Sequence, residues 1–154
     1  MKSWKNSFEG KIEIRRMKRE DLIEVSQIEK LSFPTPWSFH VFSSELNKKG
    51  FAFYYVTEYG ERVVGYAGYW KIAKEAHIVN LAIHPSFRKR GIGTKLLRYL
   101  FQEARGQGLA EVTLEVRYSN IAAQRLYDKF GFKKVAIHRH YYIDEDAIIY
   151  WKKM

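Results

Sequence analysis

The stretch NLAIHPSFRKRGIGT, residues 80–94, decides the fold expected for this chain. It begins with apolar residues that are typical of a strand, turns at His84-Pro85, and passes three consecutive cations at 88–90 before the glycines of 91–94. After it, apolar side chains recur at helical spacing on one face, and cations and glutamines occupy the other. The stretch therefore predicts a strand, a basic glycine-bearing turn and a long amphipathic helix.

This turn has the features of an anion site. The first N–H groups of a helix have no partner within the helix, and the helix dipole favours negative charge at that end. Gly91 and Gly93 allow close approach of the backbone, and the flanking cations add positive charge. We interpret the turn as a pyrophosphate cradle; the alternative is a basic turn without a ligand. It is neither a P-loop nor a dinucleotide fingerprint, because the lysine and the glycine spacing of those motifs are missing.

The run Arg88-Lys89-Arg90-Gly91-Ile92-Gly93 resembles the R/Q-x-x-G-x-G/A signature of the GNAT superfamily of N-acetyltransferases, which follows a strand and opens a long helix. The resemblance implies that acetyl-coenzyme A is the cofactor, with its pantetheine along the strand that ends at residue 83. The cofactor-binding residues that we expect are Leu81, Ala82, Ile83, Arg88, Lys89, Arg90, Gly91, Ile92, Gly93, Thr94 and Asn120.

The rest of the chain predicts a mixed α/β order. Strands are expected at 11–17, 51–58, 62–72, 75–83, 111–117, 133–142 and 147–152, and helices at 21–33, 38–46, 92–106 and 121–130. The order β-α-α-β-β-β-α-β-α-β-β matches the GNAT fold, a mostly antiparallel sheet with helices on both faces. The resemblance thus extends over nearly the whole chain, and we expect one N-acetyltransferase domain over 1–154.

Composition narrows the class of protein. The 154 residues, 46% of them hydrophobic, suffice for one globular core. The first ten residues are too polar for a signal peptide and no run is apolar enough to cross a membrane, so a cytoplasmic protein is expected. With no cysteine, an enzyme-bound thioester intermediate is excluded, and we expect no metal. The net charge of +10 suits phosphate-rich partners. No motif for sequence-specific nucleic-acid recognition is present.

Glu115 is the first candidate for chemistry. Its strand, expected between two helices, would be central and mostly buried, where a carboxylate is costly unless it is paired or used. One interpretation is a general base; the alternative is a structural ion pair with Arg117 or with a cation on a neighbouring strand. The run Leu114-Glu115-Val116-Arg117-Tyr118-Ser119-Asn120 resembles the L-E-V-R-x-S-N segment of the ribosomal-protein-alanine acetyltransferases. The resemblance makes Glu115 the proton acceptor and Asn120 a contact of coenzyme A.

Two further residues are candidates for proton transfer. Tyr127 lies in a segment, residues 126–132, that resembles the family's L-Y-x-x-x-G-F motif. This resemblance makes Tyr127 the acid that protonates the departing thiolate, whereas the pattern alone equally fits an aromatic core residue. His77 opens the strand that ends at residue 83. It is a second, weaker base candidate because relatives among the N-terminal acetyltransferases hold a catalytic water with a histidine or tyrosine there.

Substrate binding is expected at two aromatic segments. Phe33 and Pro34 belong to a stiff connector that resembles the family's first interhelical loop. Tyr141 and Tyr142, followed by 145–147, resemble its closing Y-Y-x-x-x-E-D-A hairpin. The resemblance implies that these residues grip the first residues of a polypeptide, and aromatic walls with hydroxyl tips suit that task. The alternative for the tyrosines is an ordinary hairpin role.

Together these features favour a protein N-α-acetyltransferase that acts on protein N-termini, possibly near the ribosome, as a monomer or weak homo-oligomer. One alternative is a GNAT enzyme that acetylates a lysine side chain or a small-molecule amine. The other is a non-catalytic basic domain that binds RNA or the ribosome through residues 88–90.

Overall fold

The computed structural model describes residues 11–154. The expectation about a signal peptide falls on the first ten residues and lies outside this range. The strands are β1 (Ile12–Arg16), β2 (Ala52–Tyr59), β3 (Arg62–Ile72), β4 (Glu75–Ile83), β5 (Glu111–Arg117), β6 (Lys133–His138) and β7 (Ala147–Lys153). The helices are α2 (Leu22–Ser32), α3 (Phe39–Leu46), α4 (Ile92–Gly106) and α5 (Ile121–Lys129), with short 3-10 turns at Arg19–Asp21 and Pro85–Phe87.

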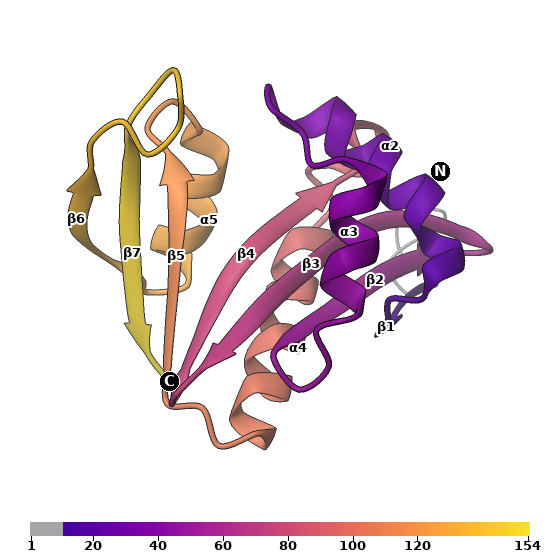
Figure 1. Ribbon diagram of the computed structural model, residues 1–154, viewed down its shortest axis with the longest axis horizontal. Coiled ribbons are helices and arrows are strands. Elements are labelled where there is room, and N and C mark those ends of the chain that lie inside the picture. The colour runs from indigo at the N-terminus through magenta and orange to yellow at the C-terminus, as the bar shows by residue number, and fades with distance from the viewer. Residues whose placement is uncertain (1–10) are drawn as a thin grey trace.

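The seven strands form one sheet in the order β1-β2-β3-β4-β5-β7-β6. Every neighbouring pair is antiparallel except β4 and β5, which are joined through α4 and run parallel. Helices α2 and α3 cover one face of the sheet, and α4 covers the other (Figure 1). The predicted fold class is therefore confirmed, and β5 has the central position that was expected for it.

Each face of the sheet has its own core. Val25, Ile28 and Phe42 pack from α2 and α3 onto one face, against Tyr54 and Tyr66 of the sheet. On the other face the apolar side of α4 is fully covered, and Tyr127 of α5 belongs to the same cluster. The amphipathic pattern that begins at residue 92 thus buries the side that the sequence predicts.

The sheet divides between β4 and β5. The two strands pair only from Glu75 opposite Glu111 to Ile78 opposite Leu114, and beyond that point they separate (Figure 1). A bulge accompanies the split: Tyr69 of β3 pairs with Ile78 and Gly68 with Asn80, which leaves Val79 without a partner on β3. Bulges bend a strand and re-aim its side chains, and they are common beside active sites.

Local signals explain how the helices begin. Ser38 accepts a hydrogen bond from the Val41 N–H at 3.2 Å, and Asn120 accepts one from the Ala123 N–H at 3.1 Å. Both residues are the N-caps that the sequence indicates. At α4 the N-cap is Gly91, in the left-handed region at φ 80°, and no side chain caps the helix. Within residues 11–154, the first amides of α4 therefore have no capping side chain and can donate to another acceptor.

The expected strand over 133–142 is too long, because β6 ends at His138. His140 adopts a left-handed φ of 55°, and its N–H donates to Asp146 at 2.8 Å. Two residues later the Tyr142 N–H donates to the carbonyl of Glu145 at 3.0 Å, which closes a turn. Residues 139–146 therefore form a folded connection between β6 and β7, so Tyr141 and Tyr142 lie outside the strand.

Candidate active site

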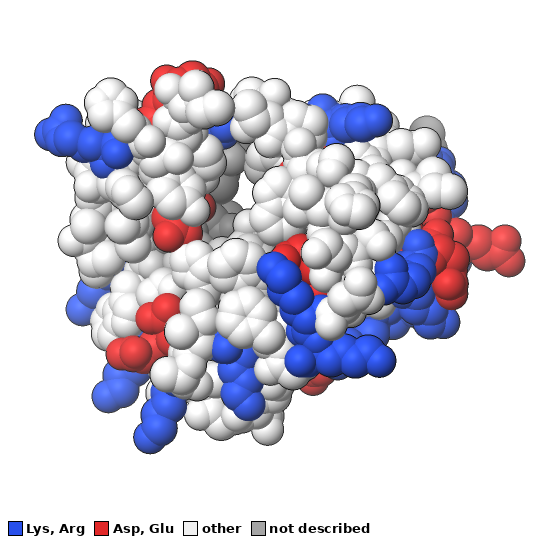
Figure 2. Space-filling model, in the orientation of Figure 1, with Lys and Arg blue, Asp and Glu red and all other residues white. Residues whose placement is uncertain are grey.

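A cleft of about 310 Å³ lies where β4 and β5 separate. Figure 2 shows it as a hollow between the part of the molecule that contains β5–β7 and the part formed by α2 and α3. Its walls come from the ends of β4 and β5, the α2–α3 connection, α5 and the β6–β7 connection. The split therefore places chain segments that are far apart in sequence around one cavity.

Glu115 and His77 meet inside this cleft. Nε2 of His77 lies 2.9 Å from Oε2 of Glu115, and their side chains are 17% and 19% exposed, so both remain within reach of a ligand. The alternative of a pair with Arg117 is wrong, because Arg117 pairs with Asp144 and Glu145. The alternative of a cation on a neighbouring strand is met by His77 of β4 when its ring is protonated. The two base candidates form one unit across β4 and β5.

Tyr127 lines the same cleft from α5. Its ring also packs edge-on against Phe132, with centroids 5.4 Å apart, and lies 5.9 Å from the ring of Tyr150. Burial, with smaller contributions from Tyr142 and Tyr150, raises the pKa of the Tyr127 phenol well above its ordinary value. The residue is thus both a core aromatic and a protonated hydroxyl group at the cleft.

The three cations of the basic turn, at residues 88–90, have different surroundings. Arg88 holds the turn together, because its guanidinium donates to the Ile83 carbonyl at 2.8 Å and to the Ser32 hydroxyl at 3.0 Å. Lys89 is exposed and adopts a left-handed φ of 62°. Arg90 contacts the Ser86 carbonyl at 3.4 Å. The turn is therefore preformed, and the uncapped first turn of α4 adds amide donors that suit a diphosphate.

The expected cofactor residues on β4 differ in whether their side chains reach the cleft. Leu81 lines the cleft, whereas the side chains of Ala82 and Ile83 are buried in the two cores. β5 pairs with β4 only as far as Ile78, so beyond that residue the edge of β4 that faces the cleft has no strand partner among residues 11–154. Backbone groups at such an edge can pair with an extended ligand that carries amides. The open edge and the uncapped helix together fit acetyl-coenzyme A.

Among the remaining expected cofactor residues, Asn120 lines the cleft and caps α5. Gly91 and Thr94 lie with the basic turn at the start of α4, where they line a second groove between α4 and β1. The Ile92 side chain is buried, so only its backbone can serve a ligand. A Cβ added at Gly93 would lie 3.8 Å from the side chains of Ile83 and Leu126.

Three of the four expected substrate residues line the cleft: Phe33, Tyr141 and Tyr142. Pro34 does not line it and is exposed. The Tyr141 and Tyr142 rings touch each other edge-on at 4.9 Å. Burial raises the pKa of Tyr142 to about 12, with smaller effects from Tyr141 and nearby charges, so the phenol is neutral at ordinary pH.

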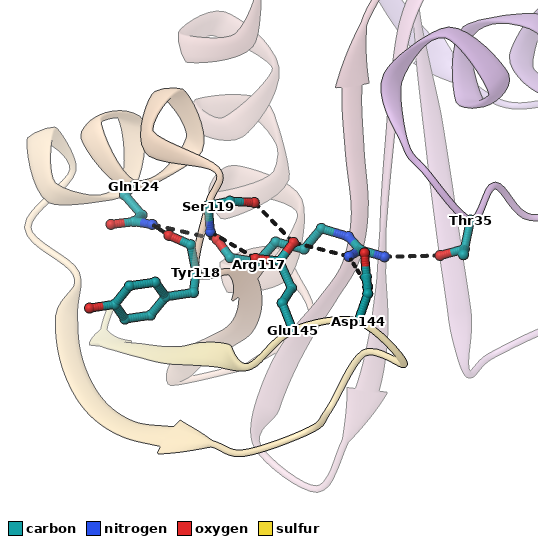
Figure 3. Close-up of polar contacts among 7 residues, drawn as sticks. All are labelled: Thr35, Arg117, Tyr118, Ser119, Gln124, Asp144 and Glu145. Atoms are coloured by element: carbon teal, nitrogen blue, oxygen red, sulfur yellow. Dashed lines mark hydrogen bonds and ion pairs between the residues drawn. The ribbon is translucent and has the colours of Figure 1, made fainter.

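Arg117 has a role that the sequence did not indicate. Its guanidinium donates to Asp144 at 2.8 Å, to Glu145 at 3.0 Å and to the Thr35 hydroxyl at 2.9 Å (Figure 3). It also lies 4.0 Å from the ring centre of Tyr142. One buried cation on β5 thus ties the α2–α3 connection to the β6–β7 connection. No spacing signal predicts this, because Thr35 is 82 residues away in the chain.

Glu29 was also missed. It lies on α2, is 2% exposed and contributes to the cleft lining. Its carboxylate accepts hydrogen bonds from the Trp37 N–H at 2.9 Å, from Asn80 at 3.0 Å and from the hydroxyl of Tyr66. Burial raises the pKa of this carboxyl despite these donors. Glu29 therefore holds the α2–α3 connection against the bulged part of β4.

The sequence profile of the Acetyltransferase (GNAT) family matches residues 22–132. This chain belongs to that family. A relative from Escherichia coli (strain K12), named [Ribosomal protein bS18]-alanine N-acetyltransferase, is 34% identical over 140 residues, 88% of this chain and 93% of that protein. An N-alpha-acetyltransferase from Sulfurisphaera tokodaii is 35% identical over 150 residues, 88% of this chain and 89% of that protein. The crystal structure of the ribosomal-protein-S18-alanine N-acetyltransferase from Escherichia coli aligns with a TM-score of 0.84 at 32% identity, over 92% of this chain and 93% of that one.

The GNAT chain is accordingly an N-acetyltransferase that uses acetyl-coenzyme A, which confirms the predicted class of enzyme and cofactor. Within residues 11–154, no helix is both long and apolar enough to cross a membrane.

Proposed function

We propose that this GNAT enzyme is a protein N-α-acetyltransferase with a single catalytic domain, which transfers an acetyl group directly to the terminal amine of a protein. The observation that carries the proposal is the Glu115–His77 contact in a cleft that also presents Tyr141 and Tyr142. Two similar proteins are named for acetylation of ribosomal protein bS18 at alanine or for N-alpha-acetylation, which supports the same substrate class.

In this proposal residues 89–94 hold the pyrophosphate through the first amides of α4, and the open edge of β4 pairs with the pantetheine arm. The bound thioester supplies the acetyl group. Leu81 and Asn120 line the cleft beside this path. Because Arg88 already bonds to Ile83 and Ser32, it shapes the turn, while Lys89 is the better placed of the two to neutralise phosphate charge.

The incoming amine enters beside Phe33, Tyr141 and Tyr142. Glu115 removes its proton, directly or through a water, with His77 as its partner. An α-amine has a pKa of about 7.7–8.0 against about 10.4 for a lysine side chain, so its neutral form is easier to reach near neutral pH. One carboxylate is therefore an adequate base for N-termini and a poorer one for lysines.

Tyr127→Phe tests the proposed acid. Because burial raises the pKa of Tyr127, the hydroxyl keeps its proton and can donate a hydrogen bond to the leaving thiolate, whereas the same shift makes complete proton transfer less favourable. We expect kcat to fall by about tenfold to a hundredfold while the melting temperature stays near that of the wild type, since the ring is kept. Single-turnover acetylation measures this step. An unchanged single-turnover rate would leave Tyr127 with only its packing role.

Two peptides of the same sequence test the substrate class. One has a free N-terminal alanine and an internal lysine, and its twin has an acetylated N-terminus. We expect acetylation of the first peptide at its α-amine and at least about a hundredfold less on the twin, because only lysine remains there. Mass spectrometry locates the added group. Equal rates on both peptides would contradict the proposal and favour a lysine acetyltransferase.

The proposed substrate also implies the place of action. Protein N-termini, including that of a ribosomal protein, are made in the cytoplasm, and we propose that the enzyme acts there, near the ribosome. The net charge of +10 favours encounters with phosphate-rich assemblies of that kind.

A further inference from the structure

Four side chains on one face of β4 and β5 form an unbroken line of hydrogen bonds that ends at Glu115. The Thr113 hydroxyl donates to Oε2 of Glu75 at 2.9 Å. The same hydroxyl oxygen lies 2.8 Å from Nδ1 of His77, and Nε2 of that ring lies 2.9 Å from Glu115. The strand register places His77 opposite Thr113, so the backbone itself sets this line up.

Counting the hydrogen-bond donors among these four side chains shows which ring nitrogen of His77 carries the hydrogen. A hydroxyl has one hydrogen, and an ionised carboxylate only accepts. The hydrogen of Thr113 goes to Glu75, so its oxygen is left as an acceptor toward His77. Nδ1 of His77 must then carry a hydrogen, and a neutral imidazole has only one. Its Nε2 therefore presents a lone pair, rather than a donor, to Glu115.

We propose that Glu75 and Thr113 are positioning residues that fix the tautomer of His77 and thereby make Glu115 a stronger base. This inference rests on the proposed function, because that function makes Glu115 the proton acceptor. With the hydrogen held on Nδ1 of a neutral ring, Nε2 and Oε2 of Glu115 are two acceptors 2.9 Å apart, and their lone pairs repel each other. The proton that the substrate ammonium gives up relieves this repulsion. The N–H bond breaks, the proton comes to lie between carboxylate and imidazole, and the freed electron pair on nitrogen attacks the acetyl carbon.

The opposite tautomer would weaken the base. An Nε2–H would donate to the carboxylate of Glu115 before any substrate arrives. A hydrogen bond to the charged form of a carboxyl lowers its pKa, and a base with a lower pKa takes a proton from an amine less readily. The contribution of Glu75 and Thr113 is thus to withhold this donor from Glu115.

No other titratable group near this line of side chains takes over the role of Glu75 and Thr113 in fixing the tautomer of His77. The groups that face the line are Tyr141 and Tyr142 from the β6–β7 connection, Arg117 two residues after Glu115 on β5, Glu111 on β5 opposite Glu75, and Lys153 on β7 opposite Glu111. Burial is the main cause that raises the pKa of both tyrosines, so they are neutral near neutral pH. Within the described part of the chain, none of these five groups is hydrogen-bonded to His77 or Thr113; Arg117 donates to Asp144, Glu145 and Thr35 instead.

Nitrogen-15 NMR of the histidine rings tests the proposal directly, with the His77 signals assigned by their loss in His77→Gln. At a pH where the ring is neutral, we expect the Nδ1–H tautomer in the wild type and in Thr113→Ser. In Thr113→Val, which keeps the shape but loses the hydroxyl, we expect a shift toward Nε2–H. The acidic limb of the kcat–pH profile should then move to lower pH, and kcat on the free-amine peptide should fall by about tenfold. Thr113→Ser should have the pH profile and the kcat of the wild type.

An Nε2–H tautomer in the wild type would overturn the proposal, as would a Thr113→Val enzyme with an unchanged tautomer and pH profile. If Thr113→Val does not fold by circular dichroism, Thr113→Ala takes its place. It also removes the hydroxyl that accepts from Nδ1, so it should give the same shift. Failure of the proposed function has a different signature: a wild-type enzyme that does not acetylate the free-amine peptide, whatever the tautomer of His77.

Discussion

Glu115→Gln is expected to lower kcat for N-terminal peptides by about a hundredfold to ten-thousandfold, the range typical of a lost general base. The fold should tolerate the change. A glutamine amide can donate to the lone pair on Nε2 of His77, so the 2.9 Å contact can become a hydrogen bond while the carboxylate is lost. Steady-state kinetics with one peptide measures the effect.

Cofactor affinity separates chemistry from binding in this variant. The proposed coenzyme contacts are the turn at 89–94 and the edge of β4, so the dissociation constant of acetyl-coenzyme A should stay within about twofold of the wild type. Glu111→Gln is the matched control, because it removes a carboxylate from the same strand four residues earlier and should leave kcat unchanged. Parallel losses of kcat and cofactor affinity in Glu115→Gln would take Glu115 out of the proposed chemistry.

Periodicity and capping residues were enough to place most elements of the fold. Ser38 and Asn120 begin the helices that they were expected to cap, and the long helix starts within one residue of Gly91. These signals are local, because a cap or an apolar face depends on neighbours three or four residues away. The strand that was expected to reach Tyr142 failed for a related reason: the left-handed backbone at His140 is stabilised by Asp146, a contact that alternation does not reveal.

The arrangement of the site was less accessible from sequence. Glu115 and His77 were each singled out, yet their contact depends on the parallel register of β4 and β5, which α4 sets from outside both strands. Glu29 lies in the stretch that predicts the helix over 21–33, and nothing in that pattern singles it out. Its burial follows from the approach of Trp37 and Asn80, which only the packed structure brings to it. Sequence patterns thus identify residues with chemical potential, whereas long-range packing decides which of them meet.

Arg117→Met is expected to raise KM for peptide substrates and to lower kcat/KM by about tenfold to a hundredfold. The guanidinium is the point at which both proposed substrate loops are joined, through Thr35 on one side and Asp144 and Glu145 on the other (Figure 3). It also supports the ring of Tyr142 from 4.0 Å. Methionine keeps much of the apolar length but none of the donors, so the two loops should lose their common position. Displacement of a binding group by about 1 Å can cost a hundredfold in rate.

The pattern of effects distinguishes a loosened peptide site from general damage. Acetyl-coenzyme A affinity should not change, because Arg117 lies outside the 89–94 turn, and cleavage by a protease within 139–146 should become faster as the connection opens. Arg62→Met, an exposed arginine at the start of β3, is the control and should leave every measurement as in the wild type. If Arg117→Met left KM for several peptides unchanged, the contacts of Arg117 with the two connections would serve stability rather than substrate binding. The peptide would then have to be held by the aromatic side chains alone.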